Sequence, residues 1–496
     1  MLRCLRVRVL ALALLCLLAA APAASAATPQ IRHVWVIVLE NESASTTFAA
    51  NSPAHFLAHD LPAAGAYIPN YFGVGHASLD NYIAMISGQA PNPDTQGDCQ
   101  MYTDFVPGLA GPNGQAVGVG CVYPSSVKTV ADQLQAKGLG WKGYMQDMGN
   151  DPAREPATCG HPALNSSDGT QQATAKDSYA ARHDPFVYFH SIIDSSVCKQ
   201  RVVPLTALPA DLSSEATTPA FSFITPSLCE DGHDSPCADG RPGGLVSADA
   251  FLRTWIPPIT GSPAYADGGL VIVTFDESDT SDASSCCGEM PGPNSPLPGI
   301  GGAGGGRVGA VMLSPFIKPG TVSSKSYNHY SLLRSIEDDF GLSHLGFAAA
   351  SGPVSFGADV FTQPLGPPGG TSPLVLQGGS PTGGSGGPGG NGSSPGSGGS
   401  KIVGCRAARL SRPRHGKYRR GALIAAARLT RSKGRPTLRL QLTHLARVAL
   451  RGRGFKGDWK LHACRLYPVS LPPGAKRVTL VAKAKGGSER RVVALR

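Results

Sequence analysis

The sequence predicts a three-layer α/β/α sandwich over residues 28–365, followed by a linker and a small β-rich module. Three observations support this prediction: long apolar runs end abruptly in polar residues, helix-like stretches separate those runs, and the composition changes sharply near residue 366. Apolar runs buried on both faces are typical of parallel strands covered by helices. Charged residues make up only 16% of the 496 residues, and the chain contains 62 Gly and 42 Pro, which excludes a coiled coil.

Residues 1–26 have the three-part organisation of a secretory signal peptide. Three arginines lie before residue 9, an apolar run covers residues 9–21, and the small residues Ala24-Ser25-Ala26 follow. We therefore expect export, with the mature chain secreted or held at the cell surface. No later apolar run is long enough to span a bilayer.

Ten cysteines follow the signal segment, and an even number in an exported chain predicts disulfides. No CxxC pair occurs, so the spacing is not that of a zinc finger. Cys286 and Cys287 are adjacent, and they either bond to separate partners or form a ring. Cys405 and Cys464 are the cysteines that follow residue 400, and we expect them to pair.

Four apolar runs are the predicted strands of one parallel sheet, at residues 34–39, 221–224, 270–275 and 308–313. In open α/β sheets, binding sites form at the carboxyl ends of parallel strands. The polar residues that follow these runs are therefore the first candidates for chemistry.

The first run ends in Glu40-Asn41, a carboxylate next to an amide, and the third ends in Asp276-Glu277. Hard divalent cations prefer oxygen ligands, and these pairs offer three charged donors and one neutral donor. Strand-end polar residues are also common in plain turns, so each pair alone is a weak signal. The metal's identity stays open.

The stretch from His76 to Gly88 predicts a helix that starts near Ser78 and ends at Gly88, with Pro91 beyond it. Ser78 occupies the predicted N-cap. Its hydroxyl either caps the helix or acts as a nucleophile, activated by the helix dipole and a nearby metal. Asn81, one turn later, is placed to donate to a phosphate oxygen.

Two more segments offer polar candidates near strand ends or helix starts. Asp231 and His233 follow the second run, and His329 precedes a helix with Leu332 and Ile336 on its apolar face. Each has a plain alternative as a solvated side chain or a polar cap. Together with the strand-end acids, they predict metal-type and phosphate-type ligands on one rim.

These segments, in order, resemble the bacterial phosphoesterase family that contains phosphatidylcholine-type phospholipases C and AcpA-like acid phosphatases, within the alkaline phosphatase-like superfamily. The likeness covers residues 31–345. The motifs that carry it are Glu40-Asn41, 76–88, 179–186, 225–234, 274–277 and 328–331.

The resemblance implies a serine phosphoesterase that needs a divalent metal. The implied metal ligands are Glu40, Asn41, Asp276 and Glu277, together with the nucleophile Ser78. His183, Asp231, His233 and His329 match polar positions around the phosphate, with Asp231 as a possible phosphate or metal ligand. His76 matches a leaving-group acid or phosphate donor. The expected reaction is attack by the serine on phosphorus, followed by hydrolysis of the phosphoseryl intermediate.

Two departures weaken a specific phospholipase assignment. Residues 42–45 read Glu-Ser-Ala-Ser where that branch has Arg-Ser-Phe-Asp, and residues 278–280 replace its usual glycines and aromatic. We therefore expect an acid phosphatase-like phosphomonoesterase. The alternatives are a phospholipase C-type phosphodiesterase and a polyanion-binding surface protein with an inactive hydrolase scaffold.

The C-terminal part has an opposite charge to the rest. Residues 366–400 contain no charge and consist mostly of Gly, Ser and Pro, which is typical of a flexible linker. Residues 401–496 carry a net charge of +24, whereas residues 1–400 carry −14. The basic module predicts binding to an anionic cell-wall polymer or membrane surface. The alternatives are that it is only a soluble basic appendage or that it docks on the acidic body, and no specific nucleic acid is predicted.

Overall fold

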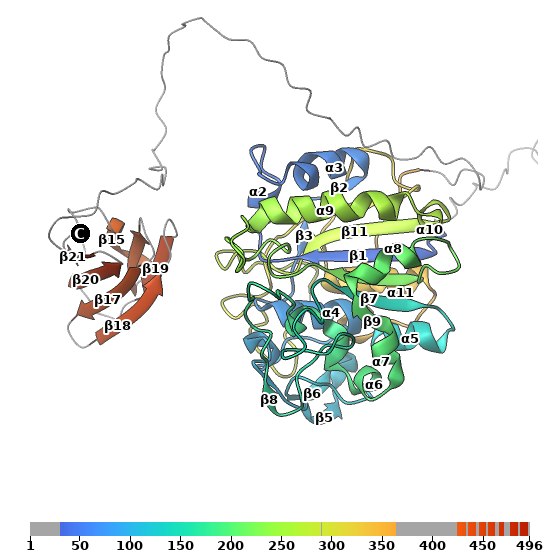
Figure 1. Cartoon of the computed structure of the whole chain (residues 1–496), viewed down its shortest axis with the longest axis horizontal. Coiled ribbons are helices and arrows are strands. Elements are labelled where there is room, and N and C mark those ends of the chain that lie inside the picture. The colour runs from blue at the N-terminus through green and yellow to red at the C-terminus, as the bar shows by residue number, and fades with distance from the viewer. Residues whose placement is uncertain are drawn as a thin grey trace, which may run out of the picture. The chain divides into compact units, whose positions relative to one another are not determined.

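The computed structural model describes residues 30–363 apart from Glu289, and strands between residues 424 and 494 (Figure 1). The chain forms two compact units, Met1–Ser380 and Pro381–Arg496, which are described separately. The predicted signal peptide, the predicted linker and the predicted Cys405–Cys464 pair lie outside the described residues. Within them, no helix has the length and apolar character needed to cross a membrane.

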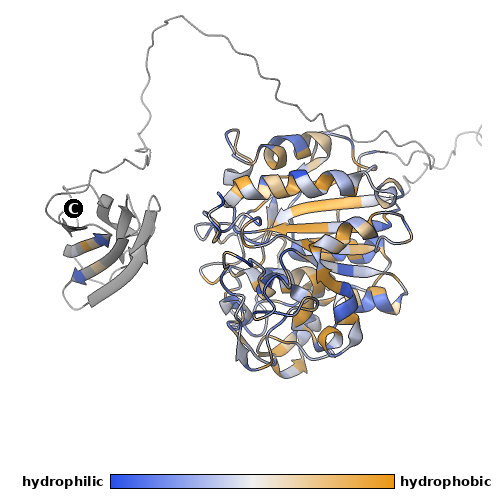
Figure 2. Ribbon diagram, in the orientation of Figure 1, coloured by the Kyte–Doolittle hydropathy of each residue, from blue (hydrophilic) through white to orange (hydrophobic). Residues whose placement is uncertain are grey.

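An eight-stranded mixed sheet forms the centre of the first unit. Its strand order is β13 (Thr321–Val322), β2 (Ala66–Ile68), β12 (Ala310–Leu313), β11 (Gly269–Phe275), β1 (His33–Leu39), β10 (Phe221–Thr225), β7 (Trp141–Met145) and β9 (Val202–Pro204). The five strands from β11 to β9 are parallel. Figure 2 shows the hydrophobic character of β1 and β11, whose residues are all buried.

The prediction that residues 308–313 form a parallel strand is wrong, because β12 runs antiparallel to β11. A parallel neighbour needs a crossover connection, usually a helix. The described residues between Phe275 and Ala310 contain no helix, so the chain returns directly in the opposite direction. β12 is still fully buried, and β2 pairs with its other edge. The apolar character of this strand therefore could not indicate whether it runs parallel or antiparallel to β11.

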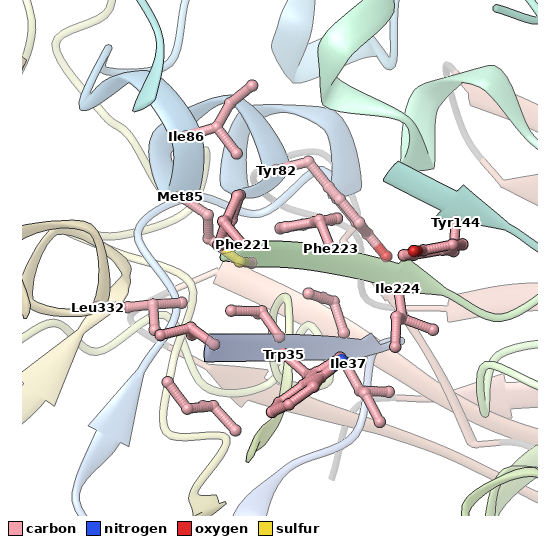
Figure 3. Packing of buried hydrophobic residues seen from close by; sticks show 14 of the residues in the cluster. Trp35, Ile37, Tyr82, Met85, Ile86, Tyr144, Phe221, Phe223, Ile224 and Leu332 are labelled. Atoms are coloured by element: carbon pink, nitrogen blue, oxygen red, sulfur yellow. The ribbon is translucent and has the colours of Figure 1, made fainter. Parts of the chain in front are cut away.

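Helices cover both faces of the sheet, which confirms the three-layer sandwich (Figure 1). On one face lie α4 (Ser78–Ser87), α5 (Val130–Ala136) and α11 (His329–Asp339), and on the other lie α9 (Gly244–Thr260) and α3 (Leu61–Ala64). In Figure 3, Tyr82, Met85 and Ile86 of α4 face β10, whereas Trp35 and Ile37 of β1 point to the opposite side. The core is therefore continuous across the sheet.

Shorter elements decorate this core. The helices are α2 (Ala44–Thr47), α6 (His190–Ile193), α7 (Ser196–Arg201), α8 (Leu208–Asp211) and α10 (Pro263–Ala266). The two-stranded pairs are β3 (Tyr71–Phe72) with β14 (Tyr327–Asn328), β4 (Met101–Tyr102) with β8 (Ser166–Ser167), and β5 (Val106–Ala110) with β6 (Ala116–Val119).

Four disulfides connect loops of the first unit: Cys99–Cys121, Cys159–Cys198, Cys229–Cys237 and Cys286–Cys287. This confirms the prediction of disulfides. Of the two alternatives for the adjacent cysteines, the structure shows the ring.

The second unit is built from antiparallel strands, in agreement with the β-rich prediction. One sheet contains β15 (Ile424–Ser432), β16 (Arg435–Leu442) and β19 (Leu466–Ser470). The other contains β18 (Phe455–Leu461), β17 (Ala446–Gly452), β20 (Arg477–Ala484) and β21 (Gly487–Ala494). The domain boundaries at residues 366 and 401 stay predictions.

Candidate active site

The strand-end carboxylates meet at one rim of the sheet. Leu39 of β1 pairs with Phe275 of β11, so the two parallel strands end at the same level. The backbone N–H of Asn41 donates to Asp276 Oδ1 at 3.1 Å, and its side-chain Nδ2 donates to Glu277 Oε1 at 2.9 Å. Glu40, Asp276 and Glu277 are all buried. The structure therefore brings together the four oxygen-bearing residues predicted from the strand ends.

The prediction that Ser78 is the N-cap of α4 is wrong by one residue, because Ala77 has the extended backbone of the cap and Ser78 is the first residue of the helix. The Ser78 hydroxyl does not cap the helix. It donates instead to Glu40 Oε2 at 2.8 Å and is 5% exposed. The hydroxyl of the predicted nucleophile is thus directed at the carboxylate rim.

Tyr82 belongs to the same site and was missed by the sequence interpretation. Its hydroxyl donates to Glu40 Oε1 at 2.6 Å, and its ring stacks on His183 with centroids 5.2 Å apart. Residues four apart lie on the same face of a helix, so the spacing from Ser78 was the signal that could have identified Tyr82.

Asn81 is used differently from its predicted role. Its Oδ1 accepts the backbone N–H groups of Val74 and Gly75 at 2.8 and 3.0 Å. Its Nδ2 donates to the carbonyl oxygens of Gly75 and Ala77, each at 3.0 Å. Since both amide hydrogens have acceptors, Asn81 holds the loop that precedes Ser78, and we do not assign it a phosphate contact.

His76 is also held by the protein through both ring nitrogens. Nδ1 lies 2.5 Å from Glu277 Oε2, and Nε2 lies 2.6 Å from the carbonyl oxygen of Asp282, which can only accept. Burial acts to lower the pKa of His76, but the hydrogen bond and charge of Glu277 outweigh it, and the pKa is raised. Both ring nitrogens of His76 are thus engaged by the protein, and the side chain has no free N–H for the predicted role of leaving-group acid.

His183 and Asp231 form a buried layer next to Glu40. His183 Nε2 lies 3.3 Å from Glu40 Oε1, and Nδ1 lies 3.7 Å from Asp231 Oδ2. Burial, followed by the positive charge of Arg182, holds the pKa of His183 well below its ordinary value. Burial raises the pKa of Asp231 to about 7.

His233 and His329 lie in different surroundings. His233 is 46% exposed, and the hydrogen bond from its Nδ1 to Asp234 at 2.9 Å raises its pKa to about 9. His329 is fully buried, and burial lowers its pKa to about 4. Its Nε2 donates to the Asp276 carbonyl at 2.6 Å, and its Nδ1 accepts from Tyr71. His329 therefore supports the backbone of the rim, whereas His233 lies at the surface.

Arg182 supplies positive charge beside the rim. Its side chain is 9% exposed, with Nε 4.0 Å from Asp98 Oδ2, and its Nη1 donates to the carbonyl of Gln171 at 3.0 Å. Its charge acts to lower the pKa of both Glu40 and Asp231. The residue precedes His183 in a motif that the sequence interpretation used, but no role was assigned to it.

The rim fits a hard divalent cation. Asn41 Oδ1 and Asp276 Oδ2 are buried and have no hydrogen-bond partner among the described residues. Burial, followed by the charges of neighbouring carboxylates, raises the pKa of Glu40 and Asp276 well above the ordinary range. A cation bound to carboxylate, amide and hydroxyl oxygens would satisfy these atoms and offset the repulsion.

In the described part of the chain, compact groups of three His, Cys, Asp or Glu ligand atoms lie away from the rim. One is Cys229, Cys237 and Asp239, and the other is His33, Glu215 and Asp267. The first offers no thiolate, because its cysteines form a disulfide. The rim remains the better cation site because it combines buried carboxylates with partnerless oxygens.

The sandwich thus places buried carboxylates and a serine hydroxyl together at one rim of the sheet. A family model described as "Phosphoesterase family" matches residues 42–343. The chain therefore belongs to the phosphoesterase family.

Named relatives agree with this assignment. An acid phosphatase from Aspergillus fumigatus is 24% identical over 63% of this chain and 55% of its own length. A phosphatidylinositol-3-phosphatase from Mycobacterium tuberculosis is 25% identical over 67% of this chain and 84% of its own. The chain spans about half the length of the fungal acid phosphatases it matches. A solved alkaline phosphatase superfamily protein from Vibrio parahaemolyticus shows 12% identity and a TM-score of 0.37, covering 63% of this chain and 67% of its own.

Proposed function

We propose that the protein is a secreted, metal-dependent phosphomonoesterase in which Ser78 is the nucleophile. The observation that carries the proposal is the 2.8 Å hydrogen bond from the buried Ser78 hydroxyl to Glu40, at the start of α4 and at the end of β1. Nucleophilic serines need a neighbouring group that favours the alkoxide, and anionic phosphate is favoured at a helix N-terminus. Both conditions are met at one oxygen atom.

Glu40, Asn41, Asp276, Glu277 and Ser78 are the residues that would hold the cation. When bound, a divalent cation supplies positive charge that stabilises the serine alkoxide and the phosphoryl oxygens. Ser78 Oγ gives its proton to Glu40 and attacks phosphorus, the bond from phosphorus to the ester oxygen breaks, and that oxygen takes up a proton from solvent and leaves as the alcohol, so a phosphoserine forms. Water then attacks phosphorus, releases inorganic phosphate and restores the hydroxyl. Tyr82 and His183 hold Glu40 in place during both steps.

The phosphomonoesterase proposal takes precedence over the phospholipase C alternative because the relatives named above are phosphatases and because residues 42–45 and 278–280 depart from the phospholipase branch. The family match and the assembled rim count against an inactive scaffold. A panel of phosphomonoesters, phosphodiesters and phospholipids, assayed with and without chelator, separates the three proposals.

Ser78→Ala tests the nucleophile. Turnover of a chromogenic phosphomonoester with added divalent metal should fall by at least about a thousandfold, because no other group forms the covalent intermediate. Ser87→Ala is the matched control, since Ser87 is buried in the same helix and donates only to the Ile83 carbonyl. Activity near that of the control would remove Ser78 from the mechanism.

Glu40→Gln tests the cation site. The substitution removes one negative charge from the rim, so metal content measured by elemental analysis should fall while the circular dichroism spectrum stays that of the folded chain. Asp211→Asn is the control, because Asp211 is a partly buried carboxylate bonded to Lys142 and Tyr144. Unchanged metal content in Glu40→Gln would count against Glu40 as a ligand.

A further inference from the structure

Two long segments of the first unit contain no charged side chain. Residues 105–127 and 290–306 contain no Asp, Glu, Lys, Arg or His. The first range includes the β5–β6 hairpin, which lies near the bottom of the view in Figure 1. Surface loops of a water-exposed protein normally carry charge, so two long neutral segments need an explanation.

Hydrogen bonds join these loops into one surface. The backbone N–H of Gly118 donates to Asn294 Oδ1, and Asn294 Nδ2 donates to the Ala116 carbonyl, both at 2.8 Å. Gln96 Nε2 also donates to the Leu297 carbonyl at 2.8 Å. The hairpin and the 290–306 loop are therefore neighbours.

Large aliphatic side chains are exposed on these loops. Six of the eleven exposed large hydrophobic residues in the described part of the chain lie here, and we call them the apolar loop surface: Val106 (59% exposed), Leu109 (61%), Val119 (45%), Met290 (67%), Leu297 (52%) and Ile300 (52%). Val106 and Val119 are opposite each other in the hairpin, so their side chains share a face. Clusters of this kind mark interaction sites.

The segment that carries Met290, Leu297 and Ile300 begins and ends at the rim of the proposed active site. The chain that carries Met290 to Ile300 leaves the sheet at Glu277, and near its start the carbonyl of Asp282 accepts the hydrogen bond from His76. It returns where the N–H of Gly305 donates to the Gly73 carbonyl at 3.0 Å. Its two ends are thus held at the site.

We propose that the apolar loop surface docks on a lipid bilayer that contains anionic headgroups. Loops without charged groups lose no ionic hydration when their aliphatic side chains enter the headgroup and acyl boundary. The same chain carries a net charge of +24 in residues 401–496, which complements anionic lipids. The surface exposes no Arg, Trp or Tyr, the residues that dominate protein interfaces, so a bilayer fits better than a protein partner. This proposal goes beyond the proposed hydrolysis and does not depend on the identity of the nucleophile.

Co-sedimentation of the full chain with vesicles tests the proposal. The vesicles contain phosphatidylcholine with a minor fraction of phosphatidylglycerol, and the double variant Leu109→Ser/Ile300→Ser is compared with wild type at about 0.15 M and about 0.5 M salt. The double variant should bind about 100-fold more weakly, because two aliphatic side chains no longer enter the bilayer. This ratio should hold at both salt concentrations, since apolar burial is not screened.

The matched control is Val322→Ser, because Val322 is 64% exposed on the edge strand β13. It should bind vesicles like wild type. All three chains should hydrolyse a soluble chromogenic ester equally, which separates docking from catalysis. A double variant that binds within about threefold of wild type would overturn the proposal, as would no binding of wild type at the lower salt concentration. If wild type is a dimer and the double variant is a monomer, while both bind vesicles equally, the surface would instead be assigned to contact with a second copy of the chain.

Discussion

Tyr82→Phe removes one hydroxyl from the rim and keeps the rest of the site. The phenylalanine ring retains the stacking on His183, whereas the 2.6 Å hydrogen bond to buried Glu40 is lost. A hydrogen bond to a charged group contributes about 1.5–3 kcal/mol. Without it, the pKa of Glu40, already raised by burial and by the charges of Asp276 and Asp231, rises further and the carboxylate binds a cation less well. At about 1.36 kcal/mol per factor of ten, kcat/KM should fall by about 10- to 150-fold.

The assay is hydrolysis of a chromogenic phosphomonoester over a range of divalent metal concentrations. The matched control is Tyr144→Phe, which removes another tyrosine hydroxyl bonded to a carboxylate, Asp211, at 2.8 Å. The control should keep wild-type activity because Asp211 is not part of the rim. If Tyr82→Phe stays within about twofold of the control at every metal concentration, Tyr82 does not position Glu40, and the energetic argument is refuted.

Two more predictions concern charge. Arg182→Gln removes a cation that lowers the pKa of Glu40 and Asp231, so the acid limb of the pH–rate profile should move to higher pH. Arg182→Lys should move it less, and identical profiles for all three chains would contradict this role. Burial raises the pKa of Glu337 from 4.5 to about 9, so its contribution to stability is present below about pH 4.5 and is lost as the pH rises through about 9. In urea unfolding, the free energy of unfolding of Glu337→Gln should decline less between about pH 4.5 and about pH 9 than that of wild type. Parallel pH dependences for the two chains would exclude this contribution of Glu337.

The sheet and the position of the carboxylates were predictable from the sequence. Apolar runs of strand length ended at Glu40-Asn41 and Asp276-Glu277, and neighbouring parallel strands that end together must place such residues at one rim. The end of α4 was predictable because Gly88, which has a left-handed φ of 67°, and Pro91 stop the helix, and its start was predicted to within one residue. The direction of β12 was not predictable from burial, because a covered antiparallel strand is equally apolar.

The hydrogen-bond partners of the polar residues could not be predicted. Asn81 and His76 have the residue types that phosphate chemistry uses, but their donors and acceptors are taken by the 74–77 loop and by Asp282. Loops have no periodicity, so the sequence contains no signal of which backbone group will meet which side chain. Tyr82 is the reverse case, since its ring packs in the apolar core while its hydroxyl donates to Glu40.

The surroundings of the rim follow from one electrostatic problem. Glu40, Asp231 and Asp276 are fully buried, and burial and the charges of neighbouring carboxylates both favour their protonated forms. A cation site needs them ionised. The protein opposes protonation with a small number of groups, among them the Tyr82 hydroxyl on Glu40 and the charge of Arg182. These groups cannot cancel the cost of burial, because the pKa of Glu40 remains raised. A bound cation would offset the remaining repulsion, so residues that help to keep the carboxylates ionised should alter metal binding without contacting the metal.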